Sequence, residues 1–298
     1  MESFEKCKFE LTDRNHLKKA TRKIPVALTI AGSDSGGGAG VQADLRTFTS
    51  YGVYGCSAIT AVTAQNPCEV RRVDALPTGS VKAQLESVFA EFDVGSIKTG
   101  MLFDSGIIRT VSKFLSVKRK FIVVVDPVMV STSGAVLLKK EAVNAVSDML
   151  FPVATWVTPN IYEAELLLGR KIGNEGEMMK AASDFAKKWN CGCIVKGGHL
   201  KIRGSIKVDA VAYEGRLYRL SGPEIETQAG HGTGCTFRAA IAAGFALGCQ
   251  WETALLSAKS FVYGSLVESV MPGGRIHAMF PPAGKYSNKA SIKQCGKY

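Results

Sequence analysis

The residues best suited to chemistry form the sequence GHGTGCTF at 230–237, which leads directly into a helix of small residues expected over 233–248. Alternating glycines allow the backbone to turn several N–H groups toward one point. The helix adds its free amides and the positive end of its dipole. Gly232, Thr233 and Gly234 therefore predict a cradle for an anion.

Cys235 lies in the same turn, and a thiol at a helix N-terminus is expected to have a pKa below its reference value of about 8.5. Beside a phosphate cradle, such a thiol would serve as a base that activates a hydroxyl for attack on phosphorus. The alternative is that the glycines only form a turn before a buried helix and that Cys235 fills space in the core. The residue types alone leave both interpretations open.

Strands that alternate with helices must position this turn. The pattern predicts strands at 24–30, 56–62, 94–98, 121–125, 155–157 and 193–195, with a hairpin at 208–213 and 216–220. Helices are predicted at 41–51, 78–92, 104–116, 138–150, 175–189, 233–248 and 251–270. This alternation is typical of an α/β fold with a doubly wound, mostly parallel sheet and helices on both faces.

Polar side chains follow most of these strands, and the carboxyl ends of parallel strands meet at one edge of a sheet. A catalytic cleft is therefore expected to gather the following residues: Asp44, Gln65, Met101, Asp126, Asn160, Glu163, Lys196 and Cys235.

Each of these residues also has a simpler interpretation. Asp126 either orients a metal-bound water or caps the next turn. Asn160 and Glu163 are one turn apart. They either only cap a helix, or they do so while Glu163 also holds magnesium through water. Lys196 either reaches a phosphate or is solvated, and Asp44 either binds a polar substrate group or is an ordinary surface acid.

Composition restricts the class of protein. The chain has 298 residues without a Pro/Ser-rich linker, which favours a single large domain. The net charge of +11 is concentrated at the ends, since residues 1–23 hold seven Lys/Arg against four acids and residues 281–298 hold four Lys and no acid. No basic stripe with interleaved aromatics predicts a nucleic-acid surface, and no apolar run predicts a membrane span. Residues 1–23 lack the features of a targeting segment.

Eight cysteines stand at positions 7, 56, 68, 191, 193, 235, 249 and 295. They contain no CxxC pair and no metal-ligand spacing with the four histidines, so the sequence indicates neither a zinc site nor a disulfide framework. This usage fits a protein of the reducing cytoplasm.

Seven motifs occur in order between about residue 24 and about residue 271, and their combination closely resembles the hydroxymethylpyrimidine/phosphomethylpyrimidine kinases of thiamine biosynthesis, in the ribokinase superfamily. They are AGSDSGGGAGVQAD (31–44), TAVTAQN (60–66), KTGML (98–102), DPVM (126–129), TPNxxE (158–163), VKGGH (195–199) and HGTGCT (231–236). The resemblance implies that Mg-ATP phosphorylates 4-amino-5-hydroxymethyl-2-methylpyrimidine and then its monophosphate.

The resemblance also implies roles for particular residues. Gly32, Asp44 and Gln65 would bind the pyrimidine, with Met101 and Val128 packed on its ring. Gly232 to Cys235 would form the anion hole, and Cys235 would replace the aspartate base of the sugar kinases. The nucleotide and magnesium would be served by Asp126, Asn160, Glu163, Lys196 and Gly198, with Glu163 acting on magnesium through water.

Several expectations complete this interpretation. The kinase domain is expected at 24–280, between a flexible extension at 1–23 and a basic tail at 281–298, and the family commonly forms homodimers. The family pattern has a small residue at position 238, where this chain has Arg238. One interpretation is that its guanidinium lowers the pKa of the Cys235 thiol or touches a phosphate. The other is that it points into solvent or toward a neighbouring acid. A pyridoxal kinase, alone or with dual activity, and a non-catalytic pyrimidine-binding or regulatory relative are the alternatives.

Overall fold

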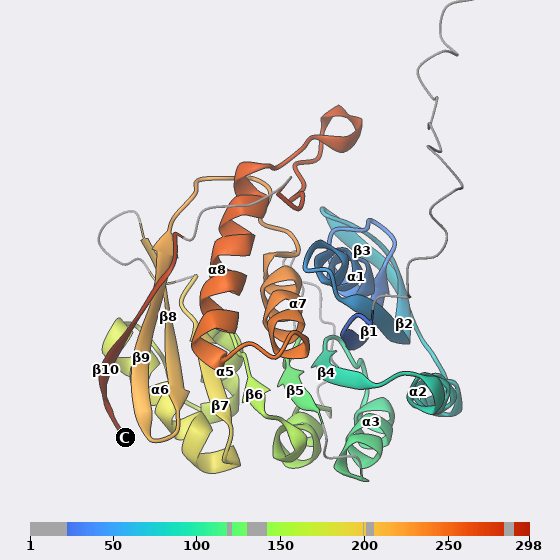
Figure 1. Ribbon diagram of the computed structural model, residues 1–298, viewed down its shortest axis with the longest axis horizontal. Helices are drawn as coiled ribbons and strands as arrows, with labels where there is room; N and C mark the ends of the chain where they lie inside the picture. Colours follow the sequence, from blue (N-terminus) through green and yellow to red (C-terminus); the bar gives the residue numbers. More distant parts are fainter. Residues whose placement is uncertain (1–22, 118–120, 130–141, 199, 201–205, 283–288) are drawn as a thin grey trace, which may run out of the picture.

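In the computed structural model, which describes residues 23–117, 121–129, 142–198, 200, 206–282 and 289–298, ten strands form one sheet (Figure 1). Their order across the sheet is β10-β9-β8-β7-β6-β5-β4-β1-β2-β3. The strands are β1 (Val26–Asp34), β2 (Tyr54–Asn66), β3 (Glu69–Ala75), β4 (Val94–Thr99), β5 (Ile122–Val125), β6 (Trp156–Val157), β7 (Gly192–Lys196), β8 (Ile206–Tyr213), β9 (Arg216–Pro223) and β10 (Ser291–Lys297).

The centre of the sheet, from β7 to β2, is parallel, whereas β3 at one edge and β8 to β10 at the other pair antiparallel. The central strands are buried on both faces and read as apolar runs, as β5 does with its sequence IVVV. The predicted α/β class with a mostly parallel centre is confirmed. Because the parallel strands all point the same way, the loops that follow them share one edge.

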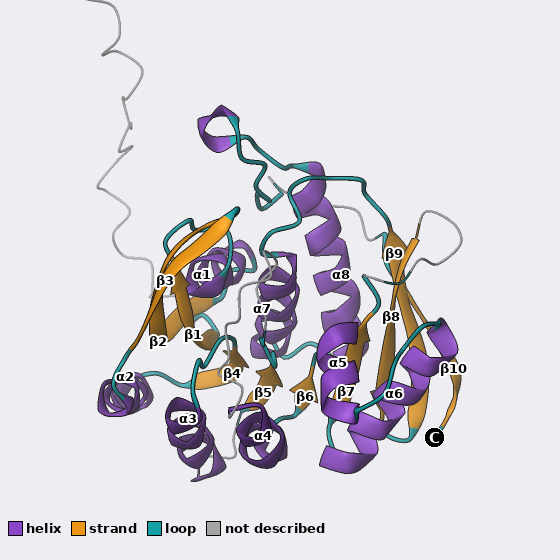
Figure 2. Cartoon of the chain, turned by 180° about the vertical axis from the view of Figure 1, so that it is seen from behind, coloured by secondary structure: helices purple, strands orange, loops and turns teal. Residues whose placement is uncertain are grey.

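Helices cover both faces of this sheet. One face carries α1 (Gly40–Ser50), α7 (Thr233–Ala246) and α8 (Trp251–Val267) (Figure 1). The other carries α2 to α6, as the view from behind shows (Figure 2). Their bounds are α2 (Thr78–Glu91), α3 (Ser105–Val117), α4 (Val143–Ala145), α5 (Ile161–Leu168) and α6 (Glu175–Trp189). No helix among the described residues has the length and apolar character to cross a bilayer.

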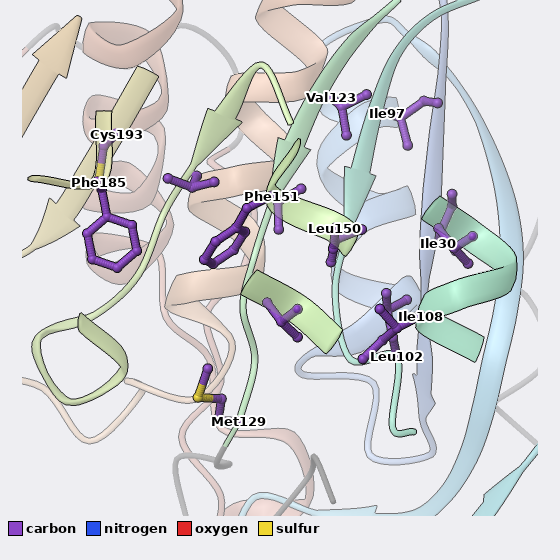
Figure 3. Close-up of a cluster of buried hydrophobic side chains, with 14 of the residues drawn as sticks. Ile30, Ile97, Leu102, Ile108, Val123, Met129, Leu150, Phe151, Phe185 and Cys193 are labelled. Atoms are coloured by element: carbon purple, nitrogen blue, oxygen red, sulfur yellow. The ribbon is translucent and has the colours of Figure 1, made fainter. Parts of the chain in front are cut away.

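The larger apolar core lies between the sheet and the second helical layer. Figure 3 shows Ile30, Ile97 and Val123 of three neighbouring strands in this cluster, together with Ile108 of α3 and Phe185 of α6. All five side chains are buried, none with more than 3% of its surface exposed. Burial of this kind stabilises a fold by about 25 cal/mol for each Å² of apolar surface removed from water. The core therefore holds the strand ends, and the loops on them, in fixed positions.

The structure departs from the sequence-based elements at several places. β1 continues to Asp34, past the predicted break at Ala31, because a register shift lets its last residues pair with β2. β3 was not predicted, since most of its residues are exposed and polar. Of the helix predicted at 138–150, only the part from Ala142 onward is described, and Val146–Leu150 of it is a π-helix.

The chain ends also differ from expectation. Residues 1–22 of the predicted flexible extension lie outside the described residues. Within the predicted basic tail, Ser291–Lys297 form a strand that adds to the edge of the sheet. The tail has few apolar residues, so the pattern of its sequence gives no indication of a strand.

Candidate active site

A cavity of about 860 Å³ lies at the carboxyl edge of the parallel strands. It gathers nearly all of the predicted polar residues, although they come from strands and helices far apart in the sequence. Among its lining residues are Gln65, Asp126, Val128, Asn160, Glu163, Lys196, Gly198 and Gly232 to Cys235. Three predicted residues do not line it: Gly32, Asp44 and Met101 lie behind its wall, where Asp44 is fully buried. The predicted cleft is thus present, but three of the residues predicted to bind the substrate do not line its surface.

The glycine turn before α7 has the features of an anion site. Gly232 is the N-cap of α7 and has a left-handed backbone with φ of 83°. A Cβ on Gly232 would overlap the carbonyl oxygen of Gly38, so the two glycine loops meet there and only glycine fits. The amides of Gly234 and Cys235 donate to no acceptor among the described residues, whereas that of Thr236 already donates to Gly232 O. Two free amides at the positive end of a helix are left to bind an anion.

The thiol of Cys235 does not have the low pKa that the sequence suggested. Burial, together with the negative charges of Asp44 and Asp126, raises the pKa to about 11, against the opposing effects of Lys98 and of the Gly40 amide. The expectation of a lowered pKa is wrong because it considered only the helix end. The sulfur therefore keeps its proton at neutral pH. The residue is nevertheless part of the cavity wall and not only core filler.

Asp44 is a buried member of an ion pair rather than a surface acid. Its Oδ2 accepts hydrogen bonds from Thr29 Oγ1 at 2.6 Å and Lys98 Nζ at 2.7 Å. Thr29 and Lys98 are register partners on β1 and β4, so two neighbouring strands hold this carboxylate. Oδ1 is buried and has no partner. It is an acceptor that a substrate amino group could satisfy.

The expected apolar contacts on a substrate ring form a small cluster of their own. Met101 is 7% exposed and packs with Ala61, and Val128 lies against this pair. Gly32 adjoins Met101, since a Cβ at position 32 would overlap the methyl group of Met101. Val128 and Gln65 both line the cavity, so an apolar and a polar side chain are available there. The arrangement suits a flat ring with polar substituents.

Asp126 and Arg238 form an ion pair beneath the anion turn. Arg238 Nη1 is 2.5 Å from Asp126 Oδ2, and Arg238 also donates to the hydroxyl of Thr158 at 2.7 Å and to its carbonyl at 3.1 Å. Among the alternatives for Arg238, the structure shows the contact with a neighbouring acid. This ion pair is buried and does not lie at the surface. Arg238 is not one of the main causes that set the pKa of the Cys235 thiol, and its influence on the thiol or on a phosphate stays a prediction.

Asn160 and Glu163 form a complete capping box at the start of α5. Asn160 Oδ1 accepts from the Glu163 amide at 2.9 Å, and Glu163 Oε2 accepts from the Asn160 amide at 2.8 Å. Capping is thus confirmed, and Glu163 also lines the cavity. Burial and the charge of Asp126 raise the pKa of Glu163 to about 8, against the effects of Arg238 and of two backbone amides.

The carboxylates near the turn fit a hard divalent cation. Asp126 Oδ1 is buried and has no hydrogen-bond partner, and burial, with the charge of Asp126 as a second cause, raises the pKa of Glu163. Mg²⁺ prefers oxygen ligands such as these carboxyl groups, with water and phosphate filling its other positions. The described residues contain no group of three or more His, Cys, Asp or Glu side chains arranged around a metal. A cation here would therefore depend on water and on the phosphates of a ligand.

Lys196 brings a positive charge to the anion turn. Its backbone N–H donates to Pro159 O at 2.9 Å, which aligns the end of β7 with the start of α5. Its Nζ lies 3.8 Å from the point where a Cβ would stand on Gly234. Gly198 follows on an open stretch of the cavity wall, where no atom would contact an added Cβ. Lys196 thus stands beside the anion turn, and its role as a phosphate ligand stays a prediction.

The cavity thus combines an anion turn, a sulfur, two buried acids and the apolar side chain of Val128. Known proteins share the sequence that builds it. A family profile described as Phosphomethylpyrimidine kinase matches residues 34–279. The chain belongs to this family. It is 45% identical over 245 residues to the hydroxymethylpyrimidine/phosphomethylpyrimidine kinase of Haemophilus influenzae, covering 82% of this chain and 91% of that protein. The enzyme of the same name from Rhizobium meliloti is 46% identical over 244 residues, covering 81% and 90%.

Solved structures agree with this membership. The pyridoxal kinase of Staphylococcus aureus in complex with pyridoxal has a TM-score of 0.82 at 31% identity and covers 92% of this chain and 100% of that chain. The phosphomethylpyrimidine kinase of Clostridium difficile has a TM-score of 0.72 at 38% identity and covers 81% and 98%. The fold is thus shared with kinases of two vitamin classes.

Sequence reasoning missed two contacts of this family member. His231 Nε2 lies 3.1 Å from Asp34 Oδ2, and the same carboxylate accepts hydrogen bonds from the amides of Gly36 and Ala39. The pair ties the first glycine loop to the anion turn. Lys98 was noted only as part of a motif, although it neutralises Asp44. An apolar-flanked lysine in a predicted central strand was the signal available, because such a lysine needs a buried acid.

Proposed function

We propose that this chain transfers the γ-phosphoryl group of ATP to the hydroxymethyl oxygen of 4-amino-5-hydroxymethyl-2-methylpyrimidine, and then phosphorylates the resulting monophosphate to the diphosphate, as a kinase of thiamine biosynthesis. The observation that carries the proposal is the pair of free amides, of Gly234 and Cys235, at the start of α7. They line the same cavity as Gln65 and Val128 and as the charged residues Asp126, Glu163 and Lys196.

Each site residue has a role in this proposal. Asp44 and Gln65 bind the polar edge of the pyrimidine, Met101 and Val128 pack on its ring, and Gly32 leaves room for Met101. Gly232, Thr233, Gly234 and Cys235 hold the migrating phosphoryl group. Neutralisation of charge on that group by aligned amides is the main contribution expected of a protein in phosphoryl transfer, and losing one such donor costs about 10²–10³ in rate.

The hydroxyl proton passes to the sulfur of Cys235 in its thiolate form while the oxygen bonds to phosphorus and the bond to the leaving ADP breaks. Lys98 and the Gly40 amide favour the thiolate, whereas burial and the two acids oppose it. Because the transition state of phosphoryl transfer is loose, the proton is needed late in the reaction. A small thiolate population is therefore compatible with turnover.

The nucleotide and its cation are assigned to the basic and acidic groups of the cavity. Asp126, Asn160, Glu163, Lys196 and Gly198 serve the phosphates, and Glu163 holds Mg²⁺ through water. When bound, Mg²⁺ would neutralise charge on the phosphates of ATP. Asp126 keeps its place through Arg238. A kinase domain at 24–280, a homodimer and a cytoplasmic location complete the proposal.

A pyridoxal kinase activity is the second candidate, and the TM-score of 0.82 to the S. aureus pyridoxal kinase favours testing it. The decisive experiment measures ADP release with the hydroxymethylpyrimidine, its monophosphate and pyridoxal side by side. We expect turnover of both pyrimidines and a loss of about 10²–10⁴ in kcat for Cys235→Ala, the usual contribution of a positioned base. ADP release with pyridoxal alone would assign the second function, and ligand binding without any ADP release would identify a non-catalytic relative.

A further inference from the structure

The last residues of the chain are fixed to the sheet rather than trailing from it. β10 pairs antiparallel with β9 along its length (Figure 1). Ser291 Oγ lies 2.9 Å from Ser221 Oγ, and the backbone N–H of Tyr298 donates to Gly215 O at 2.9 Å. This strand lies beyond residue 279, where the match to the family profile ends. The family profile therefore does not describe this strand.

The pairing of β10 places the residues before it in the wall of the active-site cavity. The backbone N–H of Ala290 donates to the hydroxyl of Ser260 on α8 at 3.3 Å, and Ser260 is 1% exposed. Lys289 and Ala290 both line the cavity. The C-terminal strand thus contributes directly to the site.

Lys289 stands at the end of the cavity remote from the pyrimidine pocket. The segment that follows it pairs with β9 and contacts α8, and the cavity wall includes residues from the end of β9, the loop after it, and α8: Gly222, Pro223, Ile225, Lys259, Val262 and Tyr263. β9 is separated from β5 and β2, which carry the ring pocket, by several strands of the sheet. Apolar and aromatic side chains with lysines beside them suit a nucleotide, whose base needs an apolar surface and whose phosphates need positive charge.

The positive charge of Lys289 is available there. The other two lysines at this end are neutralised, since Lys259 Nζ lies 2.6 Å from Asp209 and Lys207 Nζ lies 2.7 Å from Glu224. Within the described part of the chain, Lys289 has no acidic partner. An unpaired ammonium at a cavity wall is positioned to receive an anion.

We propose that residues 289–298 are part of the nucleotide site, in which β10 holds Lys289 against the cavity so that its ammonium binds the phosphate chain of ATP and ADP. The proposal rests on the proposed kinase function. It assigns Lys289 to binding of the nucleotide and not to the chemical step.

The test compares Lys289→Ala and Lys289→Glu with Lys293→Ala, a matched control whose lysine is exposed on β10 and does not line the cavity. Calorimetry measures the Kd of ADP in the full chain at low and at high salt. We expect Lys289→Ala to weaken ADP binding about threefold to tenfold, the size of one partly screened charge-assisted contact, and Lys289→Glu to weaken it more. The difference should shrink in high salt.

Steady-state kinetics supply the second readout. The KM for ATP should rise in the Lys289 variants while the KM for the pyrimidine stays unchanged, and Lys293→Ala should match the wild type in both. Equal ADP affinity in Lys289→Glu and Lys293→Ala would overturn the assignment of Lys289. Failure of the wild-type chain to bind ADP would instead overturn the proposed function.

Discussion

The guanidinium of Arg238 lies 2.5 Å from a carboxylate oxygen of Asp126, and both side chains are almost completely buried. Arg238→Ser leaves the Asp126 charge buried without its partner, and breaking a buried pair in this way costs about 3–5 kcal/mol of stability. Urea unfolding should show this loss. Adding Asp126→Asn to Arg238→Ser should recover part of it, since the unpaired charge is then removed. Additive losses in the double variant would show that the two side chains are not coupled.

The thiol of Cys235 should be slow to alkylate at neutral pH. With a pKa of about 11, about one molecule in a thousand carries the thiolate at pH 8, and this fraction rises about tenfold for each pH unit up to the pKa. Iodoacetamide labelling followed by mass spectrometry measures the rate at Cys235 from pH 7 to 10, with the exposed Cys68 as internal reference. A rate at Cys235 that reaches a plateau near pH 8 would contradict the raised pKa.

Gly232 and Gly248 provide a matched pair for testing the anion turn. Both have a left-handed backbone, with φ of 83° and 77°, but only at Gly232 would a Cβ overlap another part of the chain. Gly248→Ala should therefore cost about 1 kcal/mol of stability and leave ADP release intact. Gly232→Ala should displace the turn and lower kcat by about 10² or more. Equal effects of the two substitutions on kcat would remove the special role of the turn.

The contact of Asp34 with His231 predicts a loss of stability in acid. Burial raises the pKa of Asp34, but hydrogen bonds from His231 and from the Ala39 and Gly36 amides outweigh it and hold the pKa below 3.8. The unfolded chain therefore binds the proton more readily, so this contribution is complete above about pH 4 and is lost as the pH falls through the folded pKa. The Asp34→Asn variant should be less stable than the wild type at pH 7. Its free energy of unfolding should also fall less than that of the wild type between pH 5 and pH 3.

The control for that comparison is Asp93→Asn, which removes a carboxylate at an exposed position. Urea midpoints at the two pH values supply the measurement. An acid sensitivity of Asp34→Asn equal to that of the wild type would show that the Asp34 carboxyl does not contribute to it.

The sequence alone was sufficient to predict the parallel centre of the sheet and most of the residues that line the cavity. Runs such as IVVV define buried strands, and polar loops after parallel strands must meet at one edge. Asp126, Glu163, Lys196 and Cys235 were predicted together for that reason, and the cavity contains all four. The roles assigned to them remain predictions.

What the sequence did not predict depends on contacts between distant strands. The burial of Asp44 follows from the register of β1 against β4, which places Thr29 beside Lys98. The pKa of Cys235 depends on that same buried group, so an inference from the helix end alone had the wrong sign. Arg238 reaches Asp126 and Thr158 only because β5 and β6 are neighbours in the sheet.

The strand that ends the chain also determines what the rim of the sheet presents to other molecules. Without β10, the hydrogen-bonding groups on the outer side of β9 would face solvent and could template pairing with a second chain. β10 covers them and presents Lys293 and Lys297 in their place. Charged side chains on a rim discourage such pairing, so the segment that we assign to nucleotide binding also protects this protein from aggregation through its sheet.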